Sequence, residues 1–172
     1  MNPIVIRRAT IADLELLQKL SIQTFTETFS SENSAENITE YIQKSFNSEQ
    51  LKSELNTVES KFYIAFSSNL AVGYLKINFG GAQNENIDGN TVEIHRIYVV
   101  QNFHGKKLGQ LLLDQVKKIA KETNVDFIWL GVWEKNYRAL QFYTKNGFVV
   151  FDQHNFIMGS DKQTDLLMQL TV

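Results

Sequence analysis

The stretch Glu93–Val116 reads Glu-Ile-His-Arg-Ile-Tyr-Val-Val, then Gln-Asn-Phe-His-Gly-Lys-Lys-Leu-Gly, then Gln-Leu-Leu-Leu-Asp-Gln-Val. It predicts a β-branched strand, a tight loop that carries Gly105 and Gly109, and the start of an apolar-striped helix. Such a loop gathers the unpaired N–H groups and the positive dipole end of a helix N-terminus, which together suit a phosphate group. The loop therefore predicts a site for the pyrophosphate of a nucleotide-like cofactor. An ordinary strand-to-helix connection is the alternative, because short glycine-bearing turns are common.

The predicted strand does not alternate cleanly between apolar and polar residues. Val92 and Ile94 share one face with Arg96 and Tyr98, so apolar and polar positions change faces near His95. A change of face within a strand indicates a β-bulge, which frees backbone groups from the ladder. A strand whose two halves meet different environments explains the pattern equally well.

Composition limits the classes of protein that fit. The chain has 172 residues, 43% of them hydrophobic and 21% charged, which predicts one soluble globular domain spanning residues 1–172. There is no cysteine, which excludes disulfides, thiolate zinc sites and cysteine nucleophiles. The net charge of −2 gives no reason to expect nucleic acid as a partner, and it permits a cationic substrate. Without a signal-peptide core or a membrane-spanning run, we expect a cytoplasmic protein with no membrane partner.

Periodicity and turn signals predict the other elements. A strand at 4–8 is followed by three helices. The first is expected to be capped by Thr10 and to run towards Phe25, the second to start at Ser34, and the third to be capped by Ser48 and to run towards Val58. Further along we expect a hairpin of strands 61–66 and 71–79, a loop at 80–90, the strand 92–100 and a helix after Gly109. The rest of the chain is expected to form a strand at 127–133, a helix at 137–145, and strands 148–151 and 166–170 with a polar connection around 159–164 between them. The helix after Gly109 is expected to bury Leu108, Leu111, Leu112, Val116, Ile119 and Ala120. It joins strands 92–100 and 127–133, which makes these two strands parallel and the crossover right-handed. Ligands of such sheets lie beyond the carboxyl ends of the strands, where the glycine loop is placed.

A second informative stretch runs from Trp133 to Phe148, Trp-Glu-Lys-Asn-Tyr-Arg-Ala-Leu-Gln-Phe-Tyr-Thr-Lys-Asn-Gly-Phe. Asn136 stands between a strand end and a helix start, and Asn-Gly ends that helix. Taken alone, Phe142 and Tyr143 are typical core aromatics.

Together with the glycine loop, the set Asn136, Ala139, Phe142-Tyr143 and Gly147-Phe148 resembles the GCN5-related N-acetyltransferase (GNAT) superfamily over most of the chain. The resemblance implies an α/β (α+β) fold: a mixed, mostly antiparallel sheet with a central splayed parallel strand pair and flanking helices. It also implies acetyl-CoA as cosubstrate and a homodimer as the default assembly. The segments 20–29, 33–37, 128–136, 158–159 and 163–166 are similar to bacterial PaiA-type spermidine/spermine acetyltransferases, which implies a polyamine substrate.

By position, the resemblance assigns the cofactor-binding residues. Ile97, Tyr98 and Val99 would line the pantetheine arm and the acetyl group, and Asn136 and Ala139 belong to the same cofactor set. The pyrophosphate would lie against the loop residues His104, Gly105, Lys106, Lys107, Leu108, Gly109 and Gln110. Two of these depart from the family pattern. His104 stands where glutamine or arginine is usual and keeps a hydrogen-bond donor, and Lys107 stands where glycine is usual and lacks glycine's freedom at positive φ.

Acetyl transfer needs an acid, a base and an oxyanion donor. The resemblance implies Tyr143 as the general acid that protonates the CoA thiolate, and the Val99 backbone N–H is the candidate donor to the thioester oxygen. Because a polyamine amine is protonated at neutral pH, a base must act first; we expect Glu93, directly or through water, with His95 second. A solvated strand carboxylate is the alternative for Glu93. No metal is expected, because His95, His104 and His154 lack ligand spacing.

An alkylammonium substrate calls for carboxylates and aromatic faces. Glu27, Glu32, Glu36 and Glu40 crowd the predicted N-terminal helices, where they face either substrate or solvent. Two alternatives to the polyamine acetyltransferase remain open. One is an acetyltransferase that acts on a protein N-terminus or another small amine. The other is a weakly active CoA-binding regulatory module, which the presence of Tyr143 argues against.

Overall fold

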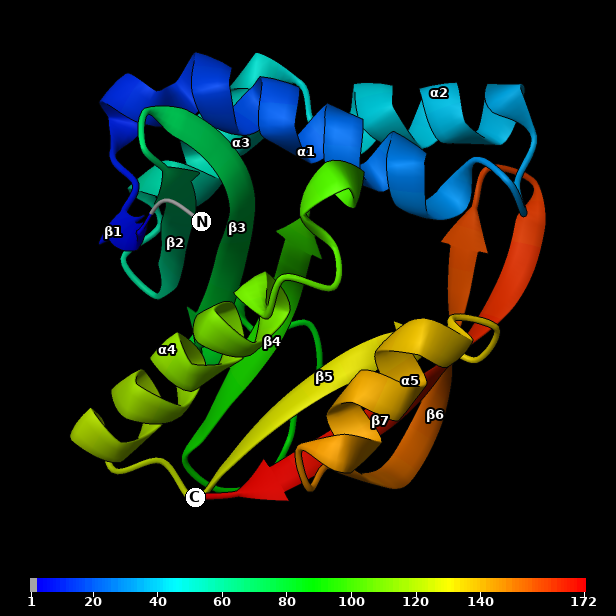
Figure 1. Cartoon of the computed structure of the whole chain (residues 1–172). Helices are drawn as coiled ribbons and strands as arrows, with labels where there is room; N and C mark the ends of the chain where they lie inside the picture. Colours follow the sequence, from blue (N-terminus) through cyan, green and yellow to red (C-terminus); the bar gives the residue numbers. More distant parts are fainter. Residues whose placement is uncertain (1–2) are drawn as a thin grey trace.

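Seven strands form one mixed sheet in the computed structural model, which describes residues 3–172. The strand order is β1-β2-β3-β4-β5-β7-β6, and every neighbouring pair is antiparallel except β4 and β5 (Figure 1). The strands are β1 Ile4–Arg8, β2 Ser60–Ser67, β3 Leu70–Phe79, β4 Thr91–Val99, β5 Phe127–Trp133, β6 Val149–Met158 and β7 Asp161–Thr171. The expected mixed, mostly antiparallel sheet with one central parallel pair is confirmed.

The helices lie in two groups. They are α1 Leu14–Phe29, α2 Ala35–Ser45, α3 Ser48–Asn56, α4 Leu108–Glu122 and α5 Tyr137–Lys145, with short 3-10 turns η1 Ile11–Asp13, η2 Gly80–Ala82 and η3 Gln101–Phe103. In Figure 1, α1, α2 and α3 lie along the top of the molecule, and α4 and α5 lie in front of β4 and β5. Among the described residues, none of the helices combines the length and the apolar character needed to cross a bilayer.

The parallel strands β4 and β5 meet only at their starts. Their ladder holds three pairs, Thr91↔Phe127, Val92↔Ile128 and Glu93↔Trp129. Beyond Glu93 the strands diverge, β4 towards α1 and β5 towards the β6–β7 hairpin (Figure 1). The gap therefore opens at the carboxyl ends of both strands, where a sheet of this kind binds ligands.

A β-bulge lies in β4 at the predicted position. Lys76 pairs with Arg96, but the next residue, Ile77, pairs with Ile94, which leaves His95 as the extra residue. The irregular alternation of this strand is therefore a bulge, and it changes which backbone groups face β3 and which face the gap.

The apolar stripe of α4 differs from the prediction at one position. Leu113 is buried and Leu111 is exposed. Leu113, Val116 and Ala120 follow the spacing i, i+3, i+7, so they share one side of the helix. Leu111 falls outside this stripe, although the other five predicted positions are buried.

The β6–β7 hairpin is longer than the sequence predicts. Residues 161–164 continue β7, and the turn contains only Gly159 and Ser160. The prediction of a polar connection at 159–164 was wrong because strands were recognised by their apolar residues. The tip of this hairpin is polar, and its strands are held together by backbone pairing between residues 161–164 and 155–158. Gly159 has φ +58°, and a Cβ there would lie 2.1 Å from Asn37 Oδ1, so the turn requires glycine and touches α2.

A second, smaller core joins the N-terminal helices to this hairpin. It contains Phe25, Ile38, Phe46, Leu51 and Met158, and partly buried aromatic residues pack against it. The predicted cap of α3 was one residue late: Asn47, not Ser48, accepts the N–H of Gln50 at 2.8 Å. The helix also ends before Val58, which is exposed.

Candidate active site

Two cavities meet in the gap between β4 and β5. The loop cavity, of about 650 Å³, lies beside residues 101–110, and the hairpin cavity, of about 620 Å³, lies beside β6 and β7. The residues that line both are Ile97, Tyr98, Asn136, Ala139 and Tyr143. All five were predicted from the sequence as site residues, and the structure places them where the two cavities join.

The loop cavity collects nearly all the predicted cofactor residues. Besides the five shared residues, its lining includes Val99, His104, Gly105, Lys107, Leu108, Gly109 and Gln110. Lys106 is the exception, because its ammonium group lies over the ring of Phe103, 4.5 Å from the centroid.

The loop presents backbone N–H groups to this cavity. Leu111 N–H makes a helical hydrogen bond to Lys107 O at 3.1 Å, so the N–H groups of Leu108, Gly109 and Gln110 precede the helical ladder. Gly105 has φ +76°, and a Cβ there would meet no atom within 4 Å, so this glycine serves the turn while leaving open space. Free donors, open space and a helix N-terminus fit a pyrophosphate.

Lys107 adopts a backbone conformation that favours glycine. Its φ is +62° at the N-cap of α4, in the left-handed region. The departure from the usual glycine therefore carries backbone strain, of about 1–2 kcal/mol for a residue with a Cβ. In return it adds a positive charge at the loop.

His104 fixes the end of β4. Its Nε2 lies 2.6 Å from Val99 O, and its Nδ1 contacts Nη1 of Arg138. Because guanidinium only donates, Nδ1 must accept, and Nε2 carries the proton that it donates to Val99 O. Val100 N–H donates to Val72 O at 3.0 Å on the β3 side. Backbone groups alternate along a strand, so the Val99 N–H points towards the gap.

Tyr143 stands at the junction of the cavities. The side chain comes from α5, is 6% exposed, and packs against the rings of Phe142 and Phe148. Burial raises the pKa of its phenol, so the hydroxyl carries its proton at neutral pH. Asn136 positions this helix, because its Oδ1 accepts the Ala139 N–H at 3.2 Å and leaves its amide N–H groups free of the cap.

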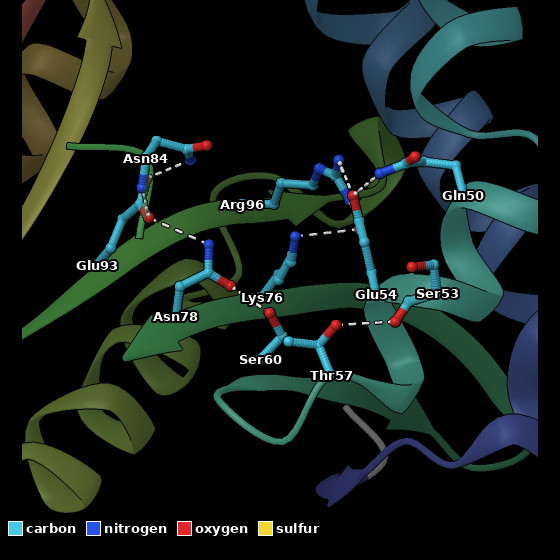
Figure 2. Close-up of polar contacts among 10 residues, drawn as sticks. All are labelled: Gln50, Ser53, Glu54, Thr57, Ser60, Lys76, Asn78, Asn84, Glu93 and Arg96. Carbon is cyan, nitrogen blue, oxygen red and sulfur yellow. Dashed lines mark hydrogen bonds and ion pairs between the residues drawn. The ribbon is translucent and has the colours of Figure 1, made fainter. Parts of the chain in front are cut away.

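Glu93 is buried in the hairpin cavity, only 3% exposed, and is not a solvated strand carboxylate. Figure 2 shows its partners: Asn84 Nδ2 donates to Oε1 at 2.6 Å, and Asn84 N and Asn78 Nδ2 donate to Oε2 at 3.0 and 3.1 Å. Ser60 in turn donates to Asn78 Oδ1 at 2.8 Å. A carboxylate accepts about four hydrogen bonds, so the remaining capacity of Glu93 lies on Oε1.

His95, the second candidate base, also lines the hairpin cavity. Burial, together with the charges of Arg96 and Lys76, lowers the pKa of its imidazole well below the usual value. The ring is therefore neutral at physiological pH. Its Nδ1 is buried and has no hydrogen-bond partner within residues 3–172.

A buried charge cluster that the sequence analysis missed lies beside these residues (Figure 2). Glu54 of α3 accepts from Lys76 at 3.1 Å and from Arg96 at 2.8 Å. Burial opposes the charge on Glu54, but Arg96 and Lys76 outweigh it and lower the pKa of the carboxyl. Burial and then the Arg96 charge lower the pKa of Lys76 to about 8. The cluster ties α3 to β3 and β4 beneath the hairpin cavity.

The carboxylates of the hairpin cavity are not those that the sequence suggested. Glu32, Glu36 and Glu40 are exposed and line neither cavity, and Glu27 lies at the loop cavity, where it accepts the Gln101 N–H at 2.8 Å. The charged and imidazole side chains that line the hairpin cavity are instead those of Glu54, Glu85, Glu93 and Asp165, the cations Lys44 and Arg96, and the imidazoles of His95 and His154. One signal was available: the polar side chains Gln83, Asn84 and Glu85 stand together shortly before β4.

Comparisons with known proteins show the family of the chain. The model of the acetyltransferase (GNAT) family matches residues 16–148. An uncharacterized N-acetyltransferase in the pepI 3′ region of Lactobacillus delbrueckii subsp. lactis is 36% identical over 98% of both chains. The spermidine N(1)-acetyltransferase of Thermoplasma acidophilum is 30% identical and covers 90% of this chain and 95% of its own. The crystal structure of the PaiA N-acetyltransferase of the same organism, in complex with coenzyme A, has a TM-score of 0.81 at 28% identity and covers 99% of both chains. The chain belongs to the GNAT acetyltransferase family.

Proposed function

We propose that this protein transfers the acetyl group of acetyl-CoA to a primary amine of a polyamine, such as spermidine or spermine, by direct attack in a ternary complex. The observation that carries the proposal is the position of Tyr143, which lines both cavities where they join. The proton donor thereby stands between a cavity suited to a phosphate-bearing cofactor and a cavity lined by carboxylates.

The loop cavity is the proposed acetyl-CoA site. The N–H groups of Leu108, Gly109 and Gln110 would hold the pyrophosphate, aided by the charge of Lys107. The gap-facing backbone at Ile97 and Val99 would meet the pantetheine arm. The resemblance to a PaiA N-acetyltransferase whose structure contains coenzyme A supports this placement. Bound there, acetyl-CoA supplies the acetyl group as a thioester.

The proposed chemistry assigns one role to each of three groups. As the amine nitrogen bonds to the carbonyl carbon and the C–S bond breaks, Glu93 accepts the amine proton and Tyr143 gives its hydroxyl proton to the departing thiolate. The Val99 N–H donates to the carbonyl oxygen as negative charge develops on it. Net, one acetyl group moves from sulfur to nitrogen. The protonated amine loses two protons: one leaves to solvent before the attack, and the other reaches CoA once Tyr143 and Glu93 have returned to their starting states.

The hairpin cavity favours an alkylammonium acceptor. Glu85, Glu93 and Asp165 supply negative charge, and Trp129 and Phe156 supply aromatic faces. Carboxylates and π-faces together attract ammonium groups on a flexible aliphatic chain. The similarity to the spermidine N(1)-acetyltransferase of Thermoplasma acidophilum supports the same acceptor class.

A single assay tests the proposal: release of the CoA thiol from acetyl-CoA with spermidine, spermine, putrescine, lysine-containing peptides, or no acceptor. We expect release that depends on a polyamine. Release only with peptides would move the assignment to a protein acetyltransferase. Tight acetyl-CoA binding without release from any amine would indicate a CoA-binding regulatory module.

A further inference from the structure

We propose that Glu85, His154 and Asp165 form a second ammonium subsite in the hairpin cavity, which makes the enzyme prefer acceptors that carry a second positive charge over monoamines. This inference rests on the proposed function and adds to it the residues that select the acceptor. The subsite is separate from Glu93 in its partners, because Glu93 is held by Asn78 and Asn84.

One imidazole lies between two carboxylates in this cluster. His154 on β6 pairs across the hairpin with Asp165 on β7. Its Nε2 lies 3.5 Å from Asp165 Oδ2, and its Nδ1 contacts Glu85 Oε1. Both carboxylates lie against this one ring, one at each of its nitrogens. A single imidazole carries at most one positive charge, so the two carboxylates together leave negative charge at this place.

Within residues 3–172, neither of the two carboxylates forms an ion pair with a lysine or an arginine. Within the described chain, the ion pairs of Glu85 and Asp165 are with His154, while the cations Lys76 and Arg96 are held by Glu54. Burial raises the pKa of Asp165, so a cation beside it offsets the cost of keeping this carboxylate charged. The remaining charge is therefore available to a ligand.

The cluster is also partly exposed, and there is open space beside it in the hairpin cavity. The side chains of Glu85, His154 and Asp165 are 35%, 30% and 16% exposed. Asp165 Oδ2 lies above Gly131 of β5, where an added Cβ would already lie 3.5 Å from it. Because position 131 has no side chain, the space beside the carboxylate stays open to the cavity that Gly131 lines.

An independent observation points to an N–H ligand at the same place. Gln163 stands two residues before Asp165 on β7, on the same side of the strand, and lines the same cavity. Its Nε2 donates to Asn33 Oδ1 at 2.8 Å, but its Oε1 is buried without a partner within residues 3–172. An ammonium group carries three N–H donors, enough for this oxygen and two carboxylates. Phe156, two residues beyond His154, adds an aromatic face.

The two ends of a polyamine need different partners. The reacting amine must lose its proton, and Glu93 with one free acceptor position suits that task. The second amine stays protonated and needs a lasting counter-charge, which the Glu85–His154–Asp165 cluster provides. A monoamine leaves that counter-charge unused.

The test compares linear diamines with monoamines of the same chain length as acceptors. Steady-state kcat and KM are measured for the natural protein and for Asp165→Asn, Glu85→Gln and the control Glu36→Gln, whose carboxylate is exposed on α2 and lines neither cavity. We expect a KM for the best diamine about tenfold below that of its monoamine. Each subsite variant should raise the diamine KM about five- to tenfold, with kcat and the monoamine KM nearly unchanged, and the control should change neither.

The outcomes separate the two proposals. Equal KM values for diamine and monoamine, or equal losses for both in the variants, would overturn the subsite while leaving acetyl transfer to amines intact. Turnover of no amine would overturn the proposed function. In that case calorimetric titration of the protein with diamine and monoamine decides the subsite by itself, since equal binding, or none, contradicts it. Glu85→Gln is the safer variant for folding, because the side chain is on an exposed loop.

Discussion

Asn84 donates hydrogen bonds to both carboxylate oxygens of Glu93, from its backbone N–H to Oε2 at 3.0 Å and from its side-chain amide to Oε1 at 2.6 Å. The neighbours of Asn84 hold the same loop to the site. Gln83 accepts from Trp129 and Thr91, and Glu85 contacts His154. Three consecutive residues of the β3–β4 loop therefore connect the candidate base with the candidate ammonium subsite.

Asn84→Ala tests this connection. Loss of the 2.6 Å hydrogen bond frees one carboxylate oxygen to move, and we expect kcat to fall about tenfold, the equivalent of one charge-assisted hydrogen bond. The acetyl-CoA Kd should stay unchanged, because Asn84 does not line the loop cavity. Asn90→Ala is the matched control, since its side chain bonds to Asn124 O and not to Glu93. A kcat equal to that of the control removes Asn84 as a positioning residue.

Lys107→Gly should stabilise the protein. Glycine removes the strain at φ +62° but gives the unfolded chain more freedom, so we expect a net gain of about 0.5–1 kcal/mol in the free energy of unfolding. Lys107→Ala is the control, because it removes the same charge and keeps the strain. Urea unfolding measures both, and equal stabilities for the two variants would contradict a strained position.

The Glu54 cluster should respond unequally to removal of its members. Glu54→Gln leaves Lys76 and Arg96 buried without a counter-charge, and we expect a loss of about 3–5 kcal/mol in the free energy of unfolding. Lys76→Met keeps the Glu54–Arg96 pair and replaces a costly buried ammonium, so its stability should be close to or above that of the natural protein. Urea unfolding at neutral pH compares them, and the reverse order would refute this reading of the cluster.

Lys76 also predicts how stability depends on alkaline pH. Its pKa is lowered from 10.5 to about 8 by burial first, so between these values the unfolded state binds more protons than the folded state. Stability from this group therefore rises as pH increases from about 8 to about 10.5, by on the order of 3 kcal/mol in total. Lys76→Met lacks this gain. The difference between the unfolding free energies of the natural protein and Lys76→Met at each pH therefore isolates the contribution of Lys76 from those of other groups that titrate in this range. A difference that stays constant over this range contradicts the lowered pKa.

Local sequence patterns predicted the elements around the loop cavity, and the resemblance to the GNAT superfamily supplied the residues of the proposed cofactor site. Regular spacing in α4 and α5, the glycine loop and the bulge near His95 are short-range features, and the structure brings the predicted residues together at Tyr143. Glu93 was identified from its place on the strand, but its burial depends on Asn78 and Asn84, which sequence spacing does not bring together.

The proposed acceptor side of the site depends on contacts between distant segments. Asp165 meets His154 through the β6–β7 register, and Glu85 reaches them from a loop 69 residues earlier. The predicted strands were too short at this hairpin because its polar tip has no apolar alternation, so the prediction placed Gln163 in a loop. The carboxylates of α2, Glu36 and Glu40, gave a stronger local signal than these residues, but they are exposed and line neither cavity.

The central claim is that Tyr143 donates the proton to the CoA thiolate where the two cavities join, and Tyr143→Phe tests it most directly. Phenylalanine keeps the ring packing against Phe142 and Phe148 and removes only the hydroxyl. The decisive measurement is kcat for CoA release with spermidine, with the Kd for acetyl-CoA measured on the same variant. The account predicts a fall of about a hundredfold or more in kcat with an unchanged Kd. An unchanged kcat would contradict it.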